Sequence, residues 1–287
     1  MTIVGSAYRE LRTKHQALKQ ILLINDVAGY GKVGMAAMLP ILSYMGIPAF
    51  NLPTALVSNT LDYGEFTELD TTEYMRRVFP IWKRLGFRFD AICTGLMFNP
   101  LQAQLVAEYC QAQAQEGCTV FVDPVMGDGG RLYNGITQEQ VQLMRHMVSV
   151  AHLTMPNYTE ACFLAGVPFM QGGITRDEGR HLLDSMVQIG AHSAIITSSI
   201  IDGQNHVCGY DADTDSYFFH PYEEIPGLFH GTGDIFSAVL IGSLMNGKPL
   251  SESTRRAMDV VSEMIDRNRD DVDYKRGIFI ERCLDLL

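Results

Sequence analysis

The chain has 287 residues, of which 47% are hydrophobic and 19% charged, and its formal net charge is -11. This length can bury a substantial core, and since no charged or Pro/Ser-rich linker divides it, we expect a single domain over residues 1–287. The acidic balance excludes broad nucleic-acid binding, which requires a positive surface to replace phosphate counterions. It is compatible with a small anionic ligand, which backbone N–H groups and a metal ion can bind locally.

The cysteines and the amino-terminal stretch bear on the compartment. The six cysteines are scattered and form no CxxC pair, so we interpret them as reduced thiols of a cytoplasmic protein. The first twenty residues lack the apolar stretch of a signal peptide, and no apolar run is long enough to span a bilayer. We therefore expect a soluble protein without a membrane partner.

The chain begins with a predicted amphipathic helix over residues 6–19, which makes 1–19 an N-terminal extension. The apolar run QILLIND, residues 20–26, predicts a buried strand. A helix is then expected up to about Met45, because Gly46 stops it.

Strands and helices alternate over most of the remaining chain. The further predicted helices are 71–85, 100–116, 137–149, 175–189, 234–246 and 251–267, and the strands between them are 89–95, 118–124, 151–157 and 193–199. This alternation indicates right-handed βαβ crossovers and a mostly parallel central sheet flanked by helices, a three-layer α/β/α fold. Residues 205–219 instead predict a small antiparallel hairpin.

Polar side chains follow several of the predicted strands. They are Asp26, Thr94, Asp123, Asn157, Thr197 and Ser198. Because open parallel sheets bind ligands at the carboxyl ends of their strands, we expect these side chains to share one site.

The sequence GTGD, residues 231–234, opens a predicted helix. Gly231 and Gly233 allow backbone conformations in which successive N–H groups, including that of Thr232, point at one anion. The positive end of the helix adds to that field, and the Asp234 carboxylate can accept a proton from an attacking alcohol. The stretch therefore fits phosphoryl transfer. The alternative is an ordinary cap, because Asp is favoured at helix starts.

Two further motifs carry acidic side chains. In VDPVMGDGG, Asp123 and Asp128 offer the hard oxygens that Mg²⁺ prefers together with phosphates, although both can simply cap turns. In MPNYTE, Asn157 and Glu160 are three apart at a helix start, which fits a capping box as well as a metal-bound water held by Glu160. The hydroxyls of ITSS either contact phosphate or satisfy loop amides.

Taken together, GTGD, DPVMGD, MPNxxE and ITSS resemble the motifs of the ribokinase-like superfamily, and within it those of the pyridoxal, pyridoxine and pyridoxamine kinases. The likeness runs from about Ile21 to about Met264. The segments INDVAGYGK, LPTALVSN and NYTEA are similar to the bacterial pyridoxamine kinase branch. No GxxxxGK[ST] motif is present, so a P-loop kinase is not expected.

The resemblance implies a ribokinase-like fold and a transferase that uses ATP to phosphorylate the 5'-hydroxymethyl group of a vitamin B6 vitamer, giving the 5'-phosphate in vitamin B6 salvage. It implies that Asp234 is the base and that the amides of Gly231, Thr232 and Gly233 hold the moving phosphoryl group. It further implies Mg²⁺, a monovalent cation such as K⁺, and a homodimer.

The same resemblance assigns sets of binding residues. The ATP site would contain Asp123, Asn157, Glu160, Thr197, Ser198, His220, Pro221 and Tyr222. Magnesium would be held by Asp123, Asp128 and Glu160, and the acceptor would be bound by Asp26, Ser58, Asn59 and Asp234.

The acceptor pocket is where the chain departs from the family pattern. Asp26 stands where many pyridoxal kinases have a serine, Leu61 stands in place of a threonine, and Leu96 stands in place of an aromatic residue. One alternative is a hydroxymethylpyrimidine kinase of thiamin biosynthesis, although such enzymes usually carry GTGC. The other is a non-catalytic homologue that binds a vitamer, which would not need the base Asp234.

Overall fold

The structure is a computed structural model that describes residues 19–133, 136–227, 229–270 and 273–287. The predicted helix over residues 6–19 therefore lies outside the described residues, apart from its last residue. None of the described helices has the length and apolarity needed to span a membrane.

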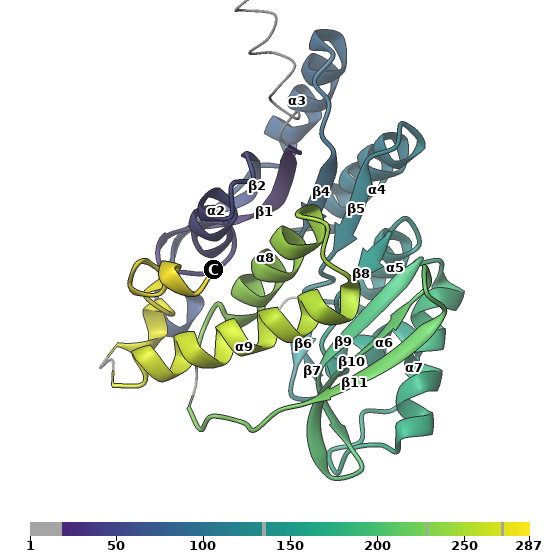
Figure 1. Ribbon diagram of the computed structural model, residues 1–287. Helices are drawn as coiled ribbons and strands as arrows, with labels where there is room; N and C mark the ends of the chain where they lie inside the picture. Colours follow the sequence, from purple (N-terminus) through teal and green to yellow (C-terminus); the bar gives the residue numbers. More distant parts are fainter. Residues whose placement is uncertain (1–18, 134–135, 228, 271–272) are drawn as a thin grey trace, which may run out of the picture.

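A nine-stranded sheet crosses the molecule in the order β11-β10-β9-β8-β5-β4-β1-β2-β3 (Figure 1). Its strands are β1 (Ile21–Tyr30), β2 (Ala49–Asn59), β3 (Glu68–Asp70), β4 (Ala91–Thr94), β5 (Thr119–Val122), β8 (Leu153–Thr154), β9 (Ser193–Ile201), β10 (Gln204–Asp211) and β11 (Ser216–Pro221). Pairing is parallel from β2 through β9 and antiparallel only where β3, β10 and β11 join at the edges. The predicted mostly parallel sheet with an edge hairpin is confirmed.

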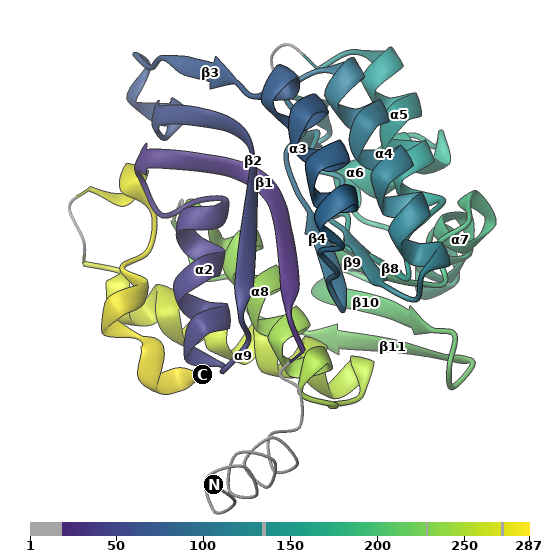
Figure 2. The ribbon, with the colours of Figure 1, turned by 90° about the horizontal axis from the view of Figure 1, so that it is seen from above.

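Helices cover both faces of this sheet. Helices α2 (Met35–Tyr44), α8 (Thr232–Met245) and α9 (Leu250–Asn268) pack on one face, and α3 (Thr72–Leu85), α4 (Pro100–Gln115), α5 (Gln138–Val148), α6 (Tyr158–Ala165) and α7 (Arg176–Ile189) pack on the other (Figure 2). Successive side chains of a strand point to opposite faces of the sheet. Along β1, Ile21 and Leu23 therefore pack in the core under α2, α8 and α9, whereas Leu22 and Ile24 pack in the core under α3 to α7. The predicted three-layer fold is confirmed.

The strand β1 is longer than predicted. It continues from residue 26 to Tyr30, paired with β2, and its register shifts between Asn25 and Val27. Asp26 is therefore inside a strand, and the expectation that it ends one was wrong. Since β4 stops at Thr94, opposite Ile24, the part of β1 that follows Ile24 lies beyond the end of this neighbour. Asp26 thus still stands at the carboxyl edge of the central strands.

The strand β2 was not predicted from the sequence, because Pro53 interrupts its apolar pattern and a proline normally argues against a central strand. Pro53 lies opposite Asn25 of β1, next to the register shift where the strand pairing is already irregular. Two residues of β9, Thr197 and Ser198, likewise stand opposite the single residue Val207 of β10. This is a β-bulge, which redirects side chains at a sheet end.

Short helices complete the fold. They are η1 (Leu61–Tyr63), η2 (Tyr274–Arg276), η3 (Ile280–Arg282) and η4 (Leu284–Leu286). The six cysteines are free and buried, which confirms that they are core thiols. A separate two-stranded hairpin, β6 (Gly127–Asp128) with β7 (Arg131–Leu132), follows β5.

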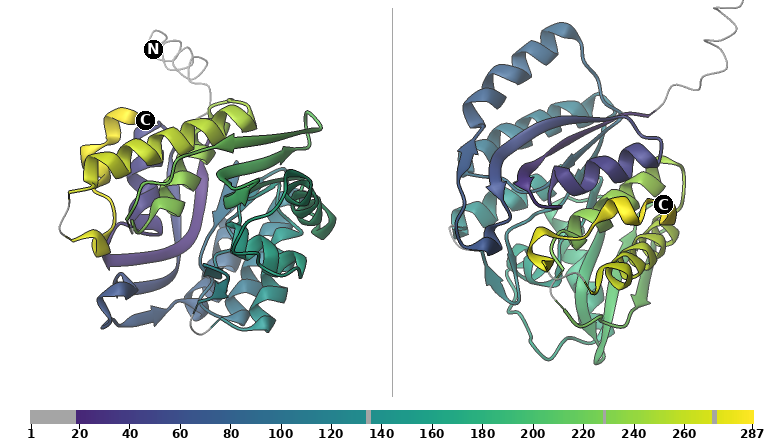
Figure 3. Two further views of the ribbon diagram at one scale, coloured as in Figure 1. Left: turned by 90° about the horizontal axis from the view of Figure 1, so that it is seen from below. Right: turned by 90° about the vertical axis from the view of Figure 1, so that its left-hand side faces the viewer.

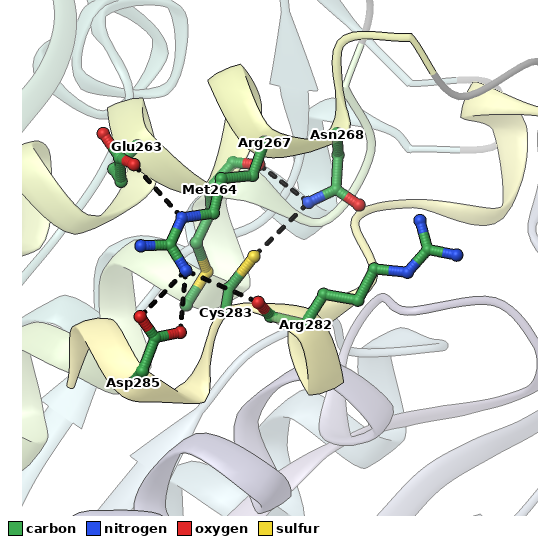
Figure 4. A network of polar contacts seen from close by, with 7 residues as sticks. All are labelled: Glu263, Met264, Arg267, Asn268, Arg282, Cys283 and Asp285. Atoms are coloured by element: carbon green, nitrogen blue, oxygen red, sulfur yellow. Dashed lines mark hydrogen bonds and ion pairs between the residues drawn. The ribbon is translucent and has the colours of Figure 1, made fainter.

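The carboxyl-terminal segment, residues 273–287, packs beside α2 and α9 (Figure 3). Ile280 and Cys283 are fully buried in the core that α2, α8 and α9 share. Figure 4 shows the polar contacts that hold the segment: Arg267 of α9 bonds both carboxylate oxygens of Asp285 at 2.7 and 2.9 Å. Asn268 donates to the Met264 carbonyl at 2.8 Å and to the Cys283 sulfur at 3.5 Å, and it accepts from the Phe279 amide at 3.2 Å.

Asn268 and Arg267 should contribute unequally to stability. Asn268 is only 6% exposed, so Asn268→Leu leaves the Phe279 amide without its acceptor and should lower the free energy of unfolding by about 1–3 kcal/mol. Arg267→Met removes an ion pair that is open to solvent, so it should lower the free energy of unfolding less than Asn268→Leu does. Urea unfolding of both variants measures the difference, and a larger loss for Arg267→Met would contradict it.

Candidate active site

Helix α8 begins at the GTGD sequence. Gly231 precedes it with φ of 80°, in the left-handed region, and a Cβ there would lie 2.1 Å from the Lys32 carbonyl oxygen. Only glycine fits this position without strain. Thr232, Gly233 and Asp234 form the first turn of α8, whose N–H groups have no acceptor within the helix, so the positive end of the helix is available to an anion.

The Asp234 side chain turns away from its own helix. It makes no capping bond to α8; its Oδ2 accepts the Gly34 amide at 2.8 Å, and its Oδ1 accepts the Asn25 side-chain amide at 3.3 Å. Asp234 therefore stands in the first turn of α8, where a negative charge is favoured, but its side chain is hydrogen-bonded to Gly34 and Asn25 instead of capping its own helix. Because Gly34 is the residue before α2, the carboxylate lies between the amino-terminal ends of two helices.

Asn25 is a site residue that the sequence reasoning missed. It is 4% exposed, and its Oδ1 accepts the amides of Leu96 at 2.9 Å and Asp26 at 3.0 Å while its amide donates to Asp234. A Cβ at Gly95 would come within 2.4 Å of this side chain, so Gly95 makes room for it. The available signal was an amide in the otherwise apolar run ILLIN.

Three half-buried carboxylates share this region. Burial, and then the negative charge of Asp234, raise the pKa of Asp26 and that of Asp123 to about 7. Burial also raises the pKa of Asp234, and the hydrogen bonds from Gly34 and Asn25, which stabilise the charged carboxylate, lower it by a smaller amount. Within the described part of the chain, no Lys, Arg or His forms an ion pair with any of the three. The site is therefore short of positive charge.

Glu160 and Asn157 form the capping box of α6. The Asn157 side chain accepts the Glu160 amide and Glu160 Oε2 accepts the Asn157 amide, both at 2.9 Å. Glu160 Oε1 also accepts the Met126 amide at 2.9 Å, so both oxygens of this buried carboxylate are bonded to backbone. The capping alternative is confirmed, and through it Glu160 holds the loop after β5 against α6.

The predicted magnesium ligands are not assembled as a three-carboxylate centre. Over the ranges that the structure describes, no group of three His, Cys, Asp or Glu side chains is placed to hold a metal ion. Glu160 is turned into the cap, and Asp128, in the exposed hairpin β6–β7, accepts the Gly129 amide at 2.7 Å. Asp123 accepts only the Ser237 hydroxyl, at 3.2 Å, which leaves an oxygen for a metal that is bound mainly by phosphates and water.

Several predicted ATP-site residues meet at the bulge of β9. Thr197 bridges to Asn157, and its amide donates to the Pro156 carbonyl at 3.0 Å. Ser198 is exposed and has φ of 56°, an uncommon left-handed conformation for serine, and the bulge imposes it. Burial raises the pKa of Tyr222, a hydrogen bond with Ser198 lowers it, and the negative charges of Glu224 and Asp128 raise it further. Tyr222 and Ser198 thus lie near one another.

His220 and Pro221, two further residues of the predicted ATP site, make contacts away from the β9 bulge. The His220 Nε2 lies 3.0 Å from both the carbonyl and the hydroxyl oxygen of Ser251, at the start of α9, so this ring fastens β11 to the helix. Pro221 is exposed and ends β11. Their contact with ATP stays a prediction.

The predicted acceptor residues Ser58 and Asn59 shape the loop after β2. The Ser58 hydroxyl accepts the Thr67 amide at 2.9 Å, and the Asn59 amide donates to the Glu65 carbonyl at 2.9 Å. These bonds close residues 58–67 into one loop. Direct contact of either side chain with an acceptor stays a prediction.

The carboxyl-terminal segment fastens this loop to the rest of the site. Thr60 donates to the Lys275 carbonyl at 2.7 Å, and the Tyr63 hydroxyl donates to Asp273 at 2.6 Å. The Lys32 amide donates to the Arg276 carbonyl at 2.7 Å, and His230, just before GTGD, lies 3.3 Å from Asp62. The turn after β1, the loop after β2 and the start of α8 are therefore held together. No local sequence pattern predicts this connection, because the contacting segments are far apart in the chain.

Comparison with known proteins agrees with this arrangement. Residues 30–279 match the model of the phosphomethylpyrimidine kinase family. The chain belongs to this family. The match covers the turn after β1, the loop after β5, the α6 cap and GTGD.

Relatives of this family member include named B6 kinases. The pyridoxine/pyridoxal/pyridoxamine kinase of Bordetella pertussis is 27% identical over 259 residues, covering 87% of this chain and 89% of that protein. A crystal structure from Bacteroides thetaiotaomicron, provisionally named a phosphomethylpyrimidine kinase, was determined in a crystal form with pyridoxal. It is 34% identical to this chain, has a TM-score of 0.89, and the match covers 94% of this chain and 96% of that one. The pyridoxal kinase of Lactobacillus plantarum has 27% identity and a TM-score of 0.84, covering 94% and 96%. The expected likeness to pyridoxal kinases, and with it the ribokinase-like fold, is confirmed.

The charge at Asp26 should make stability depend on pH. Because its folded pKa, about 7, lies above the ordinary 3.8, the folded state holds this proton more tightly, and that stabilisation is lost as the pH rises from about 4 to about 7. Asp26→Asn should therefore raise the free energy of unfolding by about 1–3 kcal/mol at pH 8 and by less at pH 5. Urea unfolding at both pH values tests this, with the exposed Asp259→Asn as control; an equal effect at both would contradict it.

Proposed function

We propose that this protein is a single-domain kinase that transfers the γ-phosphoryl group of ATP to the 5'-hydroxymethyl group of pyridoxal, pyridoxine or pyridoxamine. The observation that carries the proposal is the position of Asp234. Its carboxylate is fixed from the β1 side by Gly34 and Asn25, and it stands in the first turn of α8, beside the free N–H groups of that turn. The likeness to named pyridoxal kinases supports the choice of acceptor.

The roles of the residues follow from this geometry. Asp234 accepts the proton of the acceptor hydroxyl, and its raised pKa makes the carboxylate a better acceptor than an exposed Asp. The N–H groups of Thr232 and Gly233 bind the phosphoryl oxygens as charge moves onto them. Since α8 is anchored in a core, these donors are already oriented before the substrate arrives.

The ATP phosphates would occupy the edge formed by Asp123, Asn157 and the β9 bulge. Mg²⁺, when bound, neutralises phosphate charge, and Asp123 is the side chain with a free oxygen to hold it. Thr197 and Ser198 offer hydroxyls, and Tyr222 lies beside Ser198 at the nucleotide end. Asp128 and a metal-bound water held by Glu160 would complete the proposed magnesium site, and the proposal includes a monovalent cation such as K⁺. Buried free thiols support a cytoplasmic location.

A substrate panel tests the proposed reaction. With magnesium and ATP, the purified protein should release ADP with at least one B6 vitamer and form the corresponding 5'-phosphate, measured by a coupled ADP assay and chromatography of the product. Turnover of hydroxymethylpyrimidine alone would instead establish the thiamin-pathway alternative. Tight vitamer binding without any product would establish a binding protein.

Asp234→Asn is the control for this panel. The variant keeps the shape of the side chain but cannot accept the proton, so kcat should fall at least about 100-fold while ATP affinity stays close to that of the wild type. Retention of most turnover would contradict the role of Asp234 as base.

The protein is further proposed to be a homodimer. The outer face of the β2–β3 pair supports this, because Leu56 and Leu69 lie directly opposite each other and are 44% and 60% exposed. Adjacent exposed apolar side chains of this size are typical of an interface.

Leu69→Lys should place a charge in that interface and shift the protein toward the monomer, which sedimentation equilibrium measures as a halved mass at low micromolar concentration. Val167→Lys, at a position of comparable exposure on a different surface, is the matched control and should leave the mass unchanged. A wild-type protein that sediments as a monomer would contradict the proposed dimer.

A further inference from the structure

Asp26 lies directly beside the proposed base. The Gly34 amide donates to Asp234 Oδ2 at 2.8 Å, and a Cβ on the same glycine would lie 2.6 Å from Asp26 Oδ1. The two carboxylates therefore flank one residue. A side chain at Gly34 would collide with Asp26, so the glycine is what allows Asp26 to approach this closely.

No part of the described chain neutralises this second carboxylate. In the adjoining turns, Lys32 pairs with Glu281 and His230 lies 3.3 Å from Asp62, so both of these basic side chains already face another carboxylate. The Asp26 carboxylate also has no side-chain hydrogen-bond donor among the described residues; its backbone amide bonds to Asn25 instead. A half-buried carboxylate without a partner gains most from a cation that arrives with a ligand.

The acceptors of the proposed reaction differ in the group that would meet Asp26. The vitamers carry an aminomethyl, a hydroxymethyl or an aldehyde group on the ring carbon next to the one that bears the reactive 5'-hydroxymethyl group. The two substituents are on adjacent ring carbons, and the Asp234 and Asp26 carboxylates flank a single glycine, so we infer that a hydroxyl bound at Asp234 places the neighbouring substituent toward Asp26. The aminomethyl group alone is cationic near neutral pH, as a primary aliphatic amine like that of lysine.

We propose that Asp26 is a specificity-determining residue that pairs with the aminomethyl ammonium of pyridoxamine and so favours this vitamer over pyridoxine and pyridoxal. The inference rests on the proposed function, because it assigns the substrate of the same site. A charge-assisted hydrogen bond inside a partly buried site discriminates strongly, since a neutral substituent leaves the carboxylate unpaired. Leu61 and Leu96, the other two positions that depart from the family pattern, carry no charge, so Asp26 is the charged residue among the three.

The ratio of kcat/KM for pyridoxamine to kcat/KM for pyridoxine isolates the role of Asp26. Wild-type protein should show a higher kcat/KM for pyridoxamine than for pyridoxine, and Asp26→Asn should lower kcat/KM for pyridoxamine by about 10- to 100-fold, mostly through KM, while pyridoxine changes less than about threefold. Any indirect effect of the lost charge on Asp234 alters both substrates in the same proportion. A loss of equal size with both vitamers, or no loss, would therefore overturn the proposal.

Two further measurements keep the test independent of the reaction and of folding. Calorimetry without ATP measures the binding of pyridoxamine and pyridoxine directly, and Asp26→Asn should lose affinity for pyridoxamine selectively. Equal affinities of the wild-type protein for the two vitamers would overturn the inference, even if the protein phosphorylates neither of them. Absence of turnover with every vitamer, in contrast, contradicts the proposed function. Asp26→Ser serves if the asparagine variant does not fold, and Glu68→Gln, on the exposed edge strand β3, is the charge control that should leave the ratio unchanged.

Discussion

The position of the Asp234 carboxylate between two helix starts is the constraint around which the rest of the site is arranged. It is bonded to the amide that precedes α2 and to the side chain of Asn25 in β1, although it belongs to α8. Burial raises the free energy of its charged form, and these donors offset part of that cost. The proposed phosphate site uses N–H groups at the start of α8, so the proposed base and the proposed anion site are held relative to each other by helices α2 and α8, which pack in a common core.

The surrounding glycines and loops allow the start of α8, β1 and the carboxyl-terminal segment to pack closely together. A Cβ on Gly231 would lie only 2.1 Å from the Lys32 carbonyl oxygen, so this glycine lets the GTGD turn pack against Lys32, and Gly95 leaves space for the Asn25 side chain. The carboxyl-terminal segment then joins the turn after β1 to the loop after β2 through Lys32, Thr60 and Tyr63. The proposed acceptor side is thus held by backbone and side-chain hydrogen bonds between segments distant in the chain, whereas the proposed nucleotide side is shaped by the α6 cap and the β9 bulge.

The carboxylates divide into structural and chemical groups according to their partners. Glu160 has backbone donors on both oxygens and stabilises the loop after β5, which removes it from a preformed metal centre. Asp26 and Asp123 have fewer donors among the described residues, and burial together with the charge of Asp234 raises the pKa of both to about 7. The sequence presents all of these as similar acidic residues near glycines, and their difference lies only in the donors that the fold brings to them.

Hydrophobic periodicity determined much of the architecture by itself, because alternating buried strands and amphipathic helices admit few packings other than a parallel sheet covered on both faces. The ordered motifs likewise determined that Asp234, Asp123, Asn157 and Thr197 lie at one edge of that sheet. The sequence did not reveal β2, whose Pro53 contradicts strand propensity, nor the role of Asn25, which resembles a core position. Only the tertiary structure decided whether Asp234 caps its own helix or faces another, since that depends on donors about two hundred residues away. Local patterns carry no information about such contacts, because packing alone sets their geometry.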